Sequence, residues 1–197
     1  MGRMLWERRL TYGNGGNISV RLEDGSMLIT PSGACKGILG PEQMIRVDIQ
    51  SGKAEEGKRP SMETPFHLGI YRRRPDVGAV VHCHPLSCTV LAVQGRPFRS
   101  AMTPEAIMVL GELVPTVAYA TPGSEGLAKN VSQGLGTNKA CLLESHGALA
   151  VGKDLLDAFN RMDTMEYIAS VQLRCEELGG LDDLPEEEIA RIAGMTK

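Results

Sequence analysis

Two histidines separated by a single residue stand at the end of a short apolar run in this sequence. The run covers residues 79–84, is rich in valine and is bracketed by Gly78 and Pro85, which predicts a short buried strand. Because successive side chains of a strand point to opposite faces, His82 and His84 face one side and Cys83 faces the other. Imidazoles paired in this way are typical of half a metal site, although ordinary strand histidines give the same short pattern.

A third imidazole has a matching position elsewhere in the chain. His146 follows a second apolar run, residues 140–143, and precedes a glycine. Three imidazoles leave one position of a tetrahedral zinc ion open, which is the arrangement of catalytic rather than structural zinc sites. We therefore predict that His82, His84 and His146 hold a metal, and strand parity leaves Cys83 out of the ligand set.

The composition predicts one globular domain, residues 1–197. With 42% hydrophobic and 23% charged residues, the chain is long enough for one substantial core. A formal net charge of -3 gives no support to a nucleic-acid surface or a membrane anchor, and no apolar run has the length of a membrane span or the character of a signal peptide. The five scattered cysteines favour reduced thiols in a cytoplasmic protein.

The pattern along the chain predicts a mixed α/β fold with a central, mainly antiparallel sheet flanked by helices. Thr64 is expected to cap the second main helix, with Pro65 in its first position. The arginines that end this helix, residues 72–74, are expected to stabilise its C-terminus rather than to bind phosphate. Strands are predicted at residues 18–22, 27–30, 45–49, 79–84, 140–143 and 148–151, a helical turn at 41–44, and helices at 5–10, 64–74, 87–93, 105–110, 125–135, 155–178 and 185–193.

Three loops have the composition of an anion pocket. Gly16 with Asn17, and Ser32 with Gly33, are expected to expose backbone N–H groups in turns, where glycine lets the backbone approach an oxyanion closely. Ser61 adds a hydroxyl just before a helix N-terminus, where the dipole favours anions. Each of these segments taken alone is only a turn, so their joint meaning depends on whether they converge.

Five motifs, taken together, resemble those of the class II aldolase/adducin family. They occur in the family's order between about residues 11 and 178, and the combination is more specific for the family than for any one reaction. The motifs are Gly13-Asn14-Gly15-Gly16-Asn17-Ile18-Ser19-Val20-Arg21, Thr30-Pro31-Ser32-Gly33, Ser61-Met62-Glu63, His82-Cys83-His84 and Leu143-Glu144-Ser145-His146-Gly147.

The resemblance implies an α/β/α fold that assembles as a homotetramer with active sites between neighbouring subunits. It implies one zinc ion per chain held by His82, His84 and His146, with Glu63 as the acid/base. From the residues alone, Glu63 could equally be a helix-start charge facing solvent. The resemblance also implies a phosphate cradle made by Gly16, Asn17, Ser32, Gly33 and Ser61.

The activity implied is that of a zinc-dependent aldolase. It would reversibly cleave a ketose 1-phosphate, similar to L-fuculose 1-phosphate, into dihydroxyacetone phosphate and an aldehyde through a zinc-stabilised enediolate. Close alternatives on the same scaffold are a pentulose-phosphate epimerase, a methylthioribulose-phosphate dehydratase and an oxo-acid phosphate decarboxylase. A remote alternative is a non-catalytic, adducin-like binding domain, which would not need an intact metal set.

The sequence also departs from the family pattern. Met62 stands where many family aldolases have a second serine, Pro122 stands where an aromatic residue is expected, and the C-terminal tail has no tyrosine. Glu105 is a candidate for the missing proton transfer at the aldehyde end, although a glutamate at a helix start can be structural. The segment before Gly13 is shorter than the first family helix, so the start is expected to be truncated or divergent.

The predicted phosphate cradle contains mostly neutral donors. A phosphate held by oriented N–H groups and a helix N-terminus is expected to bind with only mild salt dependence. Lys36, just beyond Ser32 and Gly33, is the residue that could change this by reaching in as a point charge.

Overall fold

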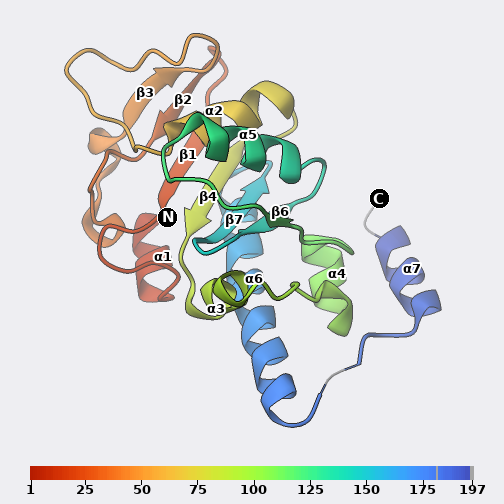
Figure 1. Ribbon diagram of the computed structural model, residues 1–197. Coiled ribbons are helices and arrows are strands. Elements are labelled where there is room, and N and C mark those ends of the chain that lie inside the picture. The colour runs from red at the N-terminus through yellow and green to blue at the C-terminus, as the bar shows by residue number, and fades with distance from the viewer. Residues whose placement is uncertain (181, 196–197) are drawn as a thin grey trace.

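A seven-stranded sheet in the order β3-β2-β1-β4-β7-β6-β5 runs through the computed structural model, which describes residues 1–180 and 182–195 (Figure 1). Neighbouring strands are antiparallel, except that β5 pairs with β6 in parallel. The mainly antiparallel sheet predicted from the sequence is therefore confirmed. The strands are β1 Asn17–Arg21, β2 Ser26–Ile29, β3 Ile45–Asp48, β4 Ala79–Cys83, β5 Thr116–Val117, β6 Ala140–Leu143 and β7 Gly147–Gly152.

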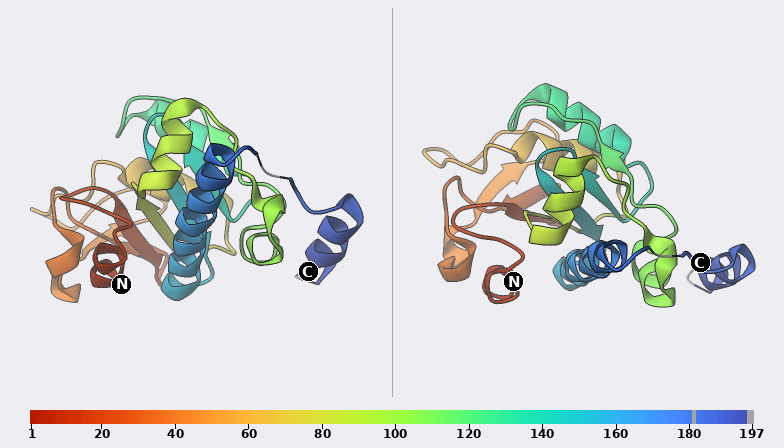
Figure 2. Two further views of the ribbon diagram at one scale, coloured as in Figure 1. Left: turned by 90° about the horizontal axis from the view of Figure 1, so that it is seen from below. Right: turned by 60° about the horizontal axis from the view of Figure 1, so that its bottom comes forward.

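Helices cover both faces of the sheet, which gives a single α/β/α domain (Figures 1 and 2). On one face lie α2 and α5, and on the other lie α1, α3, α4 and α6. The helices are α1 Gly2–Glu7, α2 Thr64–Arg73, α3 Leu86–Gln94, α4 Pro104–Leu110, α5 Glu125–Gly134, α6 Leu155–Glu177 and α7 Glu186–Gly194, with single 3-10 turns at Lys36–Ile38, Pro41–Gln43 and Ser100–Met102.

Strand β4 lies at the centre of the sheet and is buried on both faces. Ala79, Val81 and Cys83 join the core under α3 and α6, whereas Val80 joins the core under α2 and α5. A strand covered on both sides reads as a continuous apolar run, as this one does in the sequence. The His82 ring packs nearly at a right angle against the Phe66 ring of α2, with ring centroids 5.6 Å apart. His82 is therefore on the side of the sheet opposite Cys83, as strand parity predicts.

The register of the central strands brings distant segments to the histidines. Asn17, the first residue of β1, is the Cα partner of His82, and Leu149 of β7 is its partner on the other side. Strands β6 and β7 form a hairpin whose turn holds His146. The loops that precede β1, follow β4 and precede β7 therefore lie at one edge of the sheet.

The structure corrects the expected ends of two helices. Helix α1 ends at Glu7, before the expected residue 10, because Arg9 has a left-handed backbone and Leu10 turns into the core. Helix α2 begins at Thr64, which is therefore not its N-cap: the Thr64 hydroxyl donates a hydrogen bond to the Ser61 carbonyl instead. The N-cap position is taken by Glu63, which matters for the site described below.

Other sequence expectations are confirmed by packing. Arg72 donates to two loop carbonyls beyond β3, and Arg74 donates to Asp76 and to the loop before β6, so both have structural roles. Met162 and Met165 of α6 are fully buried and fill the core. Among the described residues, no helix is both long and apolar enough to cross a membrane.

The Leu142→Ala substitution is expected to destabilise the fold strongly. Leu142 of β6 has no exposed surface, so its truncation should lower the free energy of unfolding by about 2–5 kcal/mol through lost burial and a residual cavity. Leu178→Ala, at a position that is 82% exposed, is the control and should change stability by less than about 0.5 kcal/mol. Urea denaturation followed by circular dichroism measures both, and equal effects would contradict this packing.

Candidate active site

Segments that are distant in the sequence meet beside the end of β4 and form a hollow of about 220 Å³. The hollow brings together the five predicted phosphate-cradle residues, the predicted acid/base and two of the predicted metal ligands: Gly16, Asn17, Ser32, Gly33, Ser61, Glu63, His84 and His146. The remaining lining consists of Asn14, Gly15, Pro31, Lys36, Met62 and Pro122. The convergence that spacing alone left open is thus present.

The three predicted metal ligands form a compact cluster. Ligand atoms of His82, His84 and His146 all lie within 4.8 Å of one another, and the Nε2 atoms of His82 and His84 are 3.1 Å apart. His82 Nδ1 lies 2.9 Å from the Ala148 carbonyl oxygen, which can only accept. Nδ1 therefore carries the proton, and the lone pair of Nε2 is free to bind an ion.

The protonation of these rings suits a metal site. Burial holds the pKa of His82 well below its usual range, and the neighbouring imidazoles lower it further. Burial, followed by His146, lowers the pKa of His84 to about 4. Both rings are therefore neutral near pH 7, which is the form that coordinates a metal. Burial raises the pKa of Cys83 to about 12, and its side chain lies on the opposite face of the sheet, so it stays outside the cluster.

Glu63 is buried beside the histidines and does not face solvent. Only 6% of its surface is exposed, and its position at the N-cap of α2 favours a negative charge. Its Oε2 accepts a hydrogen bond from Asn17 Nδ2 at 2.6 Å and lies 3.3 Å from His82 Nε2. Its Oε1 lies 3.4 Å from His146 Nε2 and has no hydrogen-bond partner among the described residues. An open, buried carboxylate oxygen among neutral imidazoles fits a site that takes a divalent metal and exchanges a proton.

A buried network of hydrogen-bonded side chains holds Asn17 in place, and no sequence pattern predicted this network. A carboxylate only accepts, so Asn17 presents its NH₂ group to Glu63 and its Oδ1 to His67 Nε2, 2.5 Å away. Burial lowers the pKa of His67 to about 3, so the ring is neutral and its Nδ1 accepts from Ser19 Oγ at 2.7 Å. Ser19 in turn accepts from the Tyr71 hydroxyl at 2.8 Å. Each hydrogen bond of this network therefore donates its proton in the direction of Glu63.

Gly16 has a reason to be glycine beyond the approach of an anion. Its φ is +70°, in the left-handed region that favours glycine, and a Cβ there would collide with the His82 carbonyl oxygen. The glycine loop is therefore packed directly against the strand that carries the metal ligands. Ser61 contributes differently: its Oγ accepts the Glu63 amide at 3.3 Å, so its hydroxyl proton stays available to a ligand.

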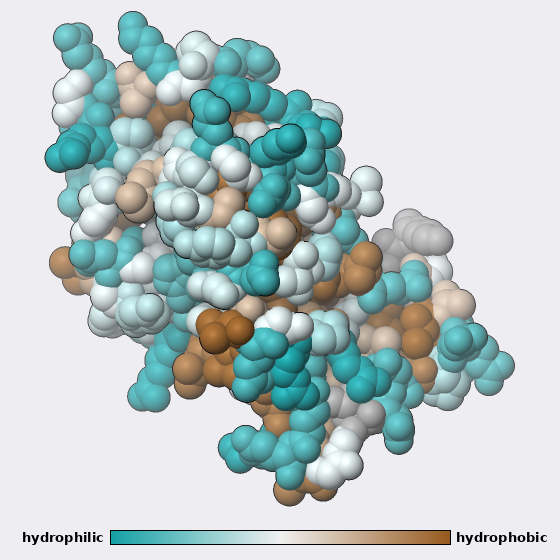
Figure 3. Space-filling model, viewed as in Figure 1, coloured by the Kyte–Doolittle hydropathy of each residue, from teal (hydrophilic) through white to brown (hydrophobic). Residues whose placement is uncertain are grey.

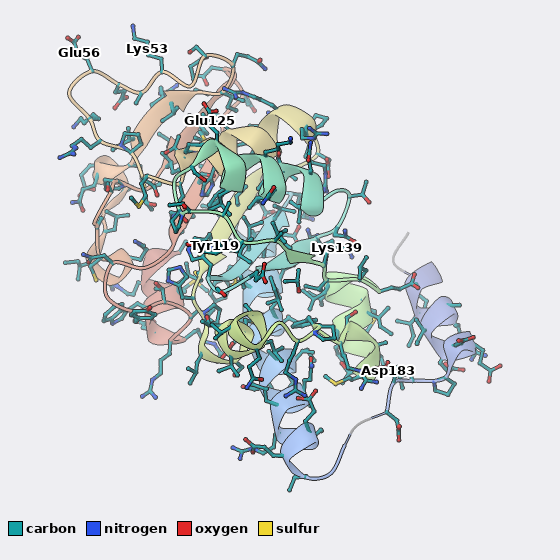
Figure 4. All side chains as sticks on the ribbon, viewed as in Figure 1. Lys53, Glu56, Tyr119, Glu125, Lys139 and Asp183 are labelled. Carbon is teal, nitrogen blue, oxygen red and sulfur yellow. The ribbon has the colours of Figure 1, made fainter. Side chains whose placement is uncertain are left out.

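Glu105 is not part of this hollow within one chain. It lies at the start of α4 in a separate depression bordered by Arg8, Asp163 and Tyr167. The described residues that line the hollow include no tyrosine, and Glu63 is their only carboxylic acid. Tyr119, labelled in Figure 4, is 55% exposed on the segment between β5 and α5, outside this lining. Glu63 is thus the one carboxylic acid of the described lining that is available for proton transfer.

The family model described as Class II Aldolase and Adducin N-terminal domain matches residues 1–173 of the chain. A 3-oxo-tetronate 4-phosphate decarboxylase from Haemophilus influenzae is 35% identical over 175 residues, which cover 87% of this chain and 82% of that protein. An L-fuculose phosphate aldolase from the same organism is 39% identical over 170 residues, which cover 86% of this chain and 77% of that protein. A solved structure of L-fuculose 1-phosphate aldolase superposes with a TM-score of 0.91 at 36% identity and covers 98% of this chain and 91% of that one.

The histidine cluster predicts one tightly bound divalent metal per chain. Replacing His82, His84 or His146 by Ala should remove most of the metal, because each ring supplies one of three ligand atoms. Elemental analysis of the purified variants measures this. His67→Ala is the control: both of its ring nitrogens are engaged by Ser19 and Asn17, so it should keep its metal. A triple histidine variant that retained stoichiometric metal would show that these histidines are not the metal ligands.

Proposed function

The chain belongs to the class II aldolase and adducin family, and from that premise we propose that it is a zinc-dependent aldolase. It would reversibly cleave a ketose 1-phosphate, similar to L-fuculose 1-phosphate, into dihydroxyacetone phosphate and an aldehyde. The observation that carries this proposal is the buried Glu63 carboxylate, fixed at one oxygen and open at the other beside three clustered histidines. A non-catalytic, adducin-like domain would not need this arrangement.

We propose zinc, one ion per chain, as the metal that His82, His84 and His146 hold. Imidazoles are suitable zinc ligands, and three of them leave one position of a tetrahedral ion open for substrate. When bound, the ion supplies a Lewis acid that stabilises negative charge on the substrate's oxygens.

Glu63 is proposed to move the carbon-bound proton. Its Oε2 is held by Asn17, which leaves Oε1 as the atom that accepts or delivers the proton. In the cleavage direction, the hydroxyl group that becomes the aldehyde loses its proton, the bond between the donor unit and the aldehyde breaks, and the electron pair stays on the donor carbon. Glu63, in its protonated form, then delivers a proton to that carbon, so that one proton leaves an oxygen and one reaches a carbon. In the condensation direction, it removes the same proton from dihydroxyacetone phosphate.

The glycine and serine loops of the hollow are proposed to bind the substrate's phosphate. Gly16, Asn17, Ser32, Gly33 and Ser61 line the hollow, and Ser61 keeps a free hydroxyl donor. A non-reacting phosphate bound there would position the reacting carbons against Glu63. Part of its binding energy would therefore appear as turnover rather than affinity.

A second candidate function is decarboxylation of an oxo-acid phosphate. Loss of carbon dioxide leaves no aldehyde, so it needs no proton transfer to or from an aldehyde oxygen. Glu63 is the only carboxylic acid in the described lining of the hollow and is already proposed to serve the donor carbon, which favours this reading. The similarity to a 3-oxo-tetronate 4-phosphate decarboxylase also supports it.

The two reactions are separated by the fragment that leaves. By their structures, a ketose 1-phosphate and a 3-oxo-tetronate 4-phosphate both yield dihydroxyacetone phosphate, so detecting that product alone cannot tell them apart. Metal-loaded protein should be incubated with each substrate while aldehyde and carbon dioxide are measured separately. Aldehyde release supports the aldolase, and carbon dioxide release without aldehyde supports the decarboxylase.

We further propose a cytoplasmic homotetramer with active sites between subunits. Apolar side chains are exposed on α3 and α6, including Leu86, Val93 and Tyr167, and Figure 3 shows apolar groups gathered in the lower part of one face. All five cysteines are free, which suits a reducing compartment. If Glu105 serves the aldehyde end, it does so in a neighbouring subunit's hollow, because it does not reach its own.

Glu63→Gln should reduce turnover by roughly 10² to 10⁴, the usual cost of losing a general acid or base, and leave the fold and metal intact. The measurement is exchange of a carbon-bound hydrogen of dihydroxyacetone phosphate with deuterated water, followed by NMR. This exchange needs only proton removal and return, so it tests Glu63 independently of the aldehyde. Native-rate exchange by the glutamine variant would exclude Glu63 as the base.

The shared site predicts complementation between two impaired variants. Coexpressed Glu63→Gln and Glu105→Ala chains should form mixed assemblies in which roughly a quarter of the sites combine an intact Glu63 with an intact Glu105 from the neighbour. Aldolase activity of the mixture should then exceed that of either parent. Glu63→Gln coexpressed with His84→Ala is the control and should not recover, since both residues belong to the same chain's hollow. No gain in the first mixture would refute a role for Glu105 in trans.

A further inference from the structure

Lys36 is a buried lysine in the lining of the hollow. Only 3% of its surface is exposed, and its Nζ donates hydrogen bonds to the carbonyl oxygens of Asn14 at 2.6 Å and Ala34 at 2.8 Å. None of the carboxylates in residues 1–180 and 182–195 forms an ion pair with it. The ammonium group thus has two neutral partners and a third N–H without one.

Such a group is costly for a protein to keep. An ammonium removed from water is destabilised unless an opposite charge or a full set of acceptors compensates it. Burial accordingly lowers the pKa of Lys36. Two carbonyls satisfy part of the requirement, and a ligand with negative charge would satisfy the rest.

The position of Lys36 connects it to two loops of the cradle. Asn14 directly precedes the Gly15-Gly16 turn, and Ala34 directly follows Ser32 and Gly33. The ammonium therefore ties these loops together and adds a positive charge where both line the hollow.

We infer that Lys36 is a specificity-determining residue that makes the hollow select a phosphate dianion over less charged ligands. The inference rests on the proposed function, because it assigns a charge to the proposed phosphate subsite. It replaces the expectation, drawn from the motifs alone, that the cradle is made of neutral donors. The same ammonium positions the two loops, so its two effects must be separated by experiment.

The ionic form of the ligand separates charge from loop positioning. Inorganic phosphate gains its second negative charge near neutral pH, so titrations from pH 6 to 8 compare the monoanion with the dianion. A lysine that only tied the loops would, when removed, weaken both forms alike. A lysine that supplies charge makes the native protein prefer the dianion, and its removal abolishes that preference.

The test uses metal-loaded protein and calorimetric titration with inorganic phosphate. Lys36→Met should bind the dianion about tenfold to a hundredfold more weakly, the usual effect of losing a charged hydrogen-bond donor, and should lose the pH dependence. Lys139→Met is the matched control. Lys139, labelled in Figure 4, also donates to a backbone carbonyl and also has a pKa lowered by burial, but it lies outside the hollow, so phosphate binding should not change.

The outcomes distinguish this inference from the proposed function. If the native protein binds phosphate and Lys36→Met keeps both the affinity and the dianion preference, the inference is wrong while the proposed function stands. If the native protein does not bind phosphate, both the inference and the proposed function are wrong. Should Lys36→Met fail to fold, Lys36→Gln decides, because its NH₂ group keeps N–H donors for the loops and it removes the charge: a preserved dianion preference would overturn the inference.

Discussion

The hydrogen bond from Asn17 Nδ2 to Glu63 Oε2, buried and 2.6 Å long, is the contact on which the geometry of the site depends. It joins the first residue of β1 to the N-cap position of α2, and the register of β1 and β4 places Asn17 directly opposite His82. Because Oε2 is fixed, Oε1 remains open toward His146. A buried carboxylate oxygen without a partner is costly in an ordinary core. Here the cost is tolerable because the same oxygen lies where an ion and a reacting carbon are proposed to sit.

The sheet order makes this contact possible. Antiparallel neighbours run in opposite directions, so the start of β1, the end of β4 and the start of β7 share one edge. The loops at these three strand ends carry the glycine turn, His84 and the turn that holds His146. Burial of β4 on both faces fixes the height and orientation of His82, and the carbonyl of Ala148 on β7 fixes its tautomer. A rigid central strand with a polar end is a better support for a metal cluster than a surface loop.

The pairing of His82 and His84 could be predicted from the sequence, because strand parity is a local property that gives them a common face wherever the strand lies. The role of His67 could not be predicted, because nothing in the spacing of Asn17, Ser19 and His67 says that β1 and α2 pack side by side with these groups in line. The sequence places Lys36 near the cradle, but its burial depends on long-range packing that the sequence does not predict. Helix α1 packs against this segment, with Gly2 against the Lys36 backbone. Glu105 shows the opposite limit. A carboxylate at a helix start is a suitable proton carrier, but its position in the sequence does not tell which hollow it lines.

The distribution of chemistry within the hollow bears on how one scaffold supports several reactions. The clustered histidines, Glu63 and the proposed phosphate cradle all belong to a single chain, and they are proposed to act on the part of the substrate that aldol cleavage and decarboxylation have in common. The lining also contains Met62 and Pro122, which donate no side-chain protons to a leaving fragment. An aldehyde leaving there must exchange a proton with some acid or base, whereas carbon dioxide needs none. The residues that line the hollow in this chain are compatible with both reactions, so the motifs that define the family do not by themselves select one of them.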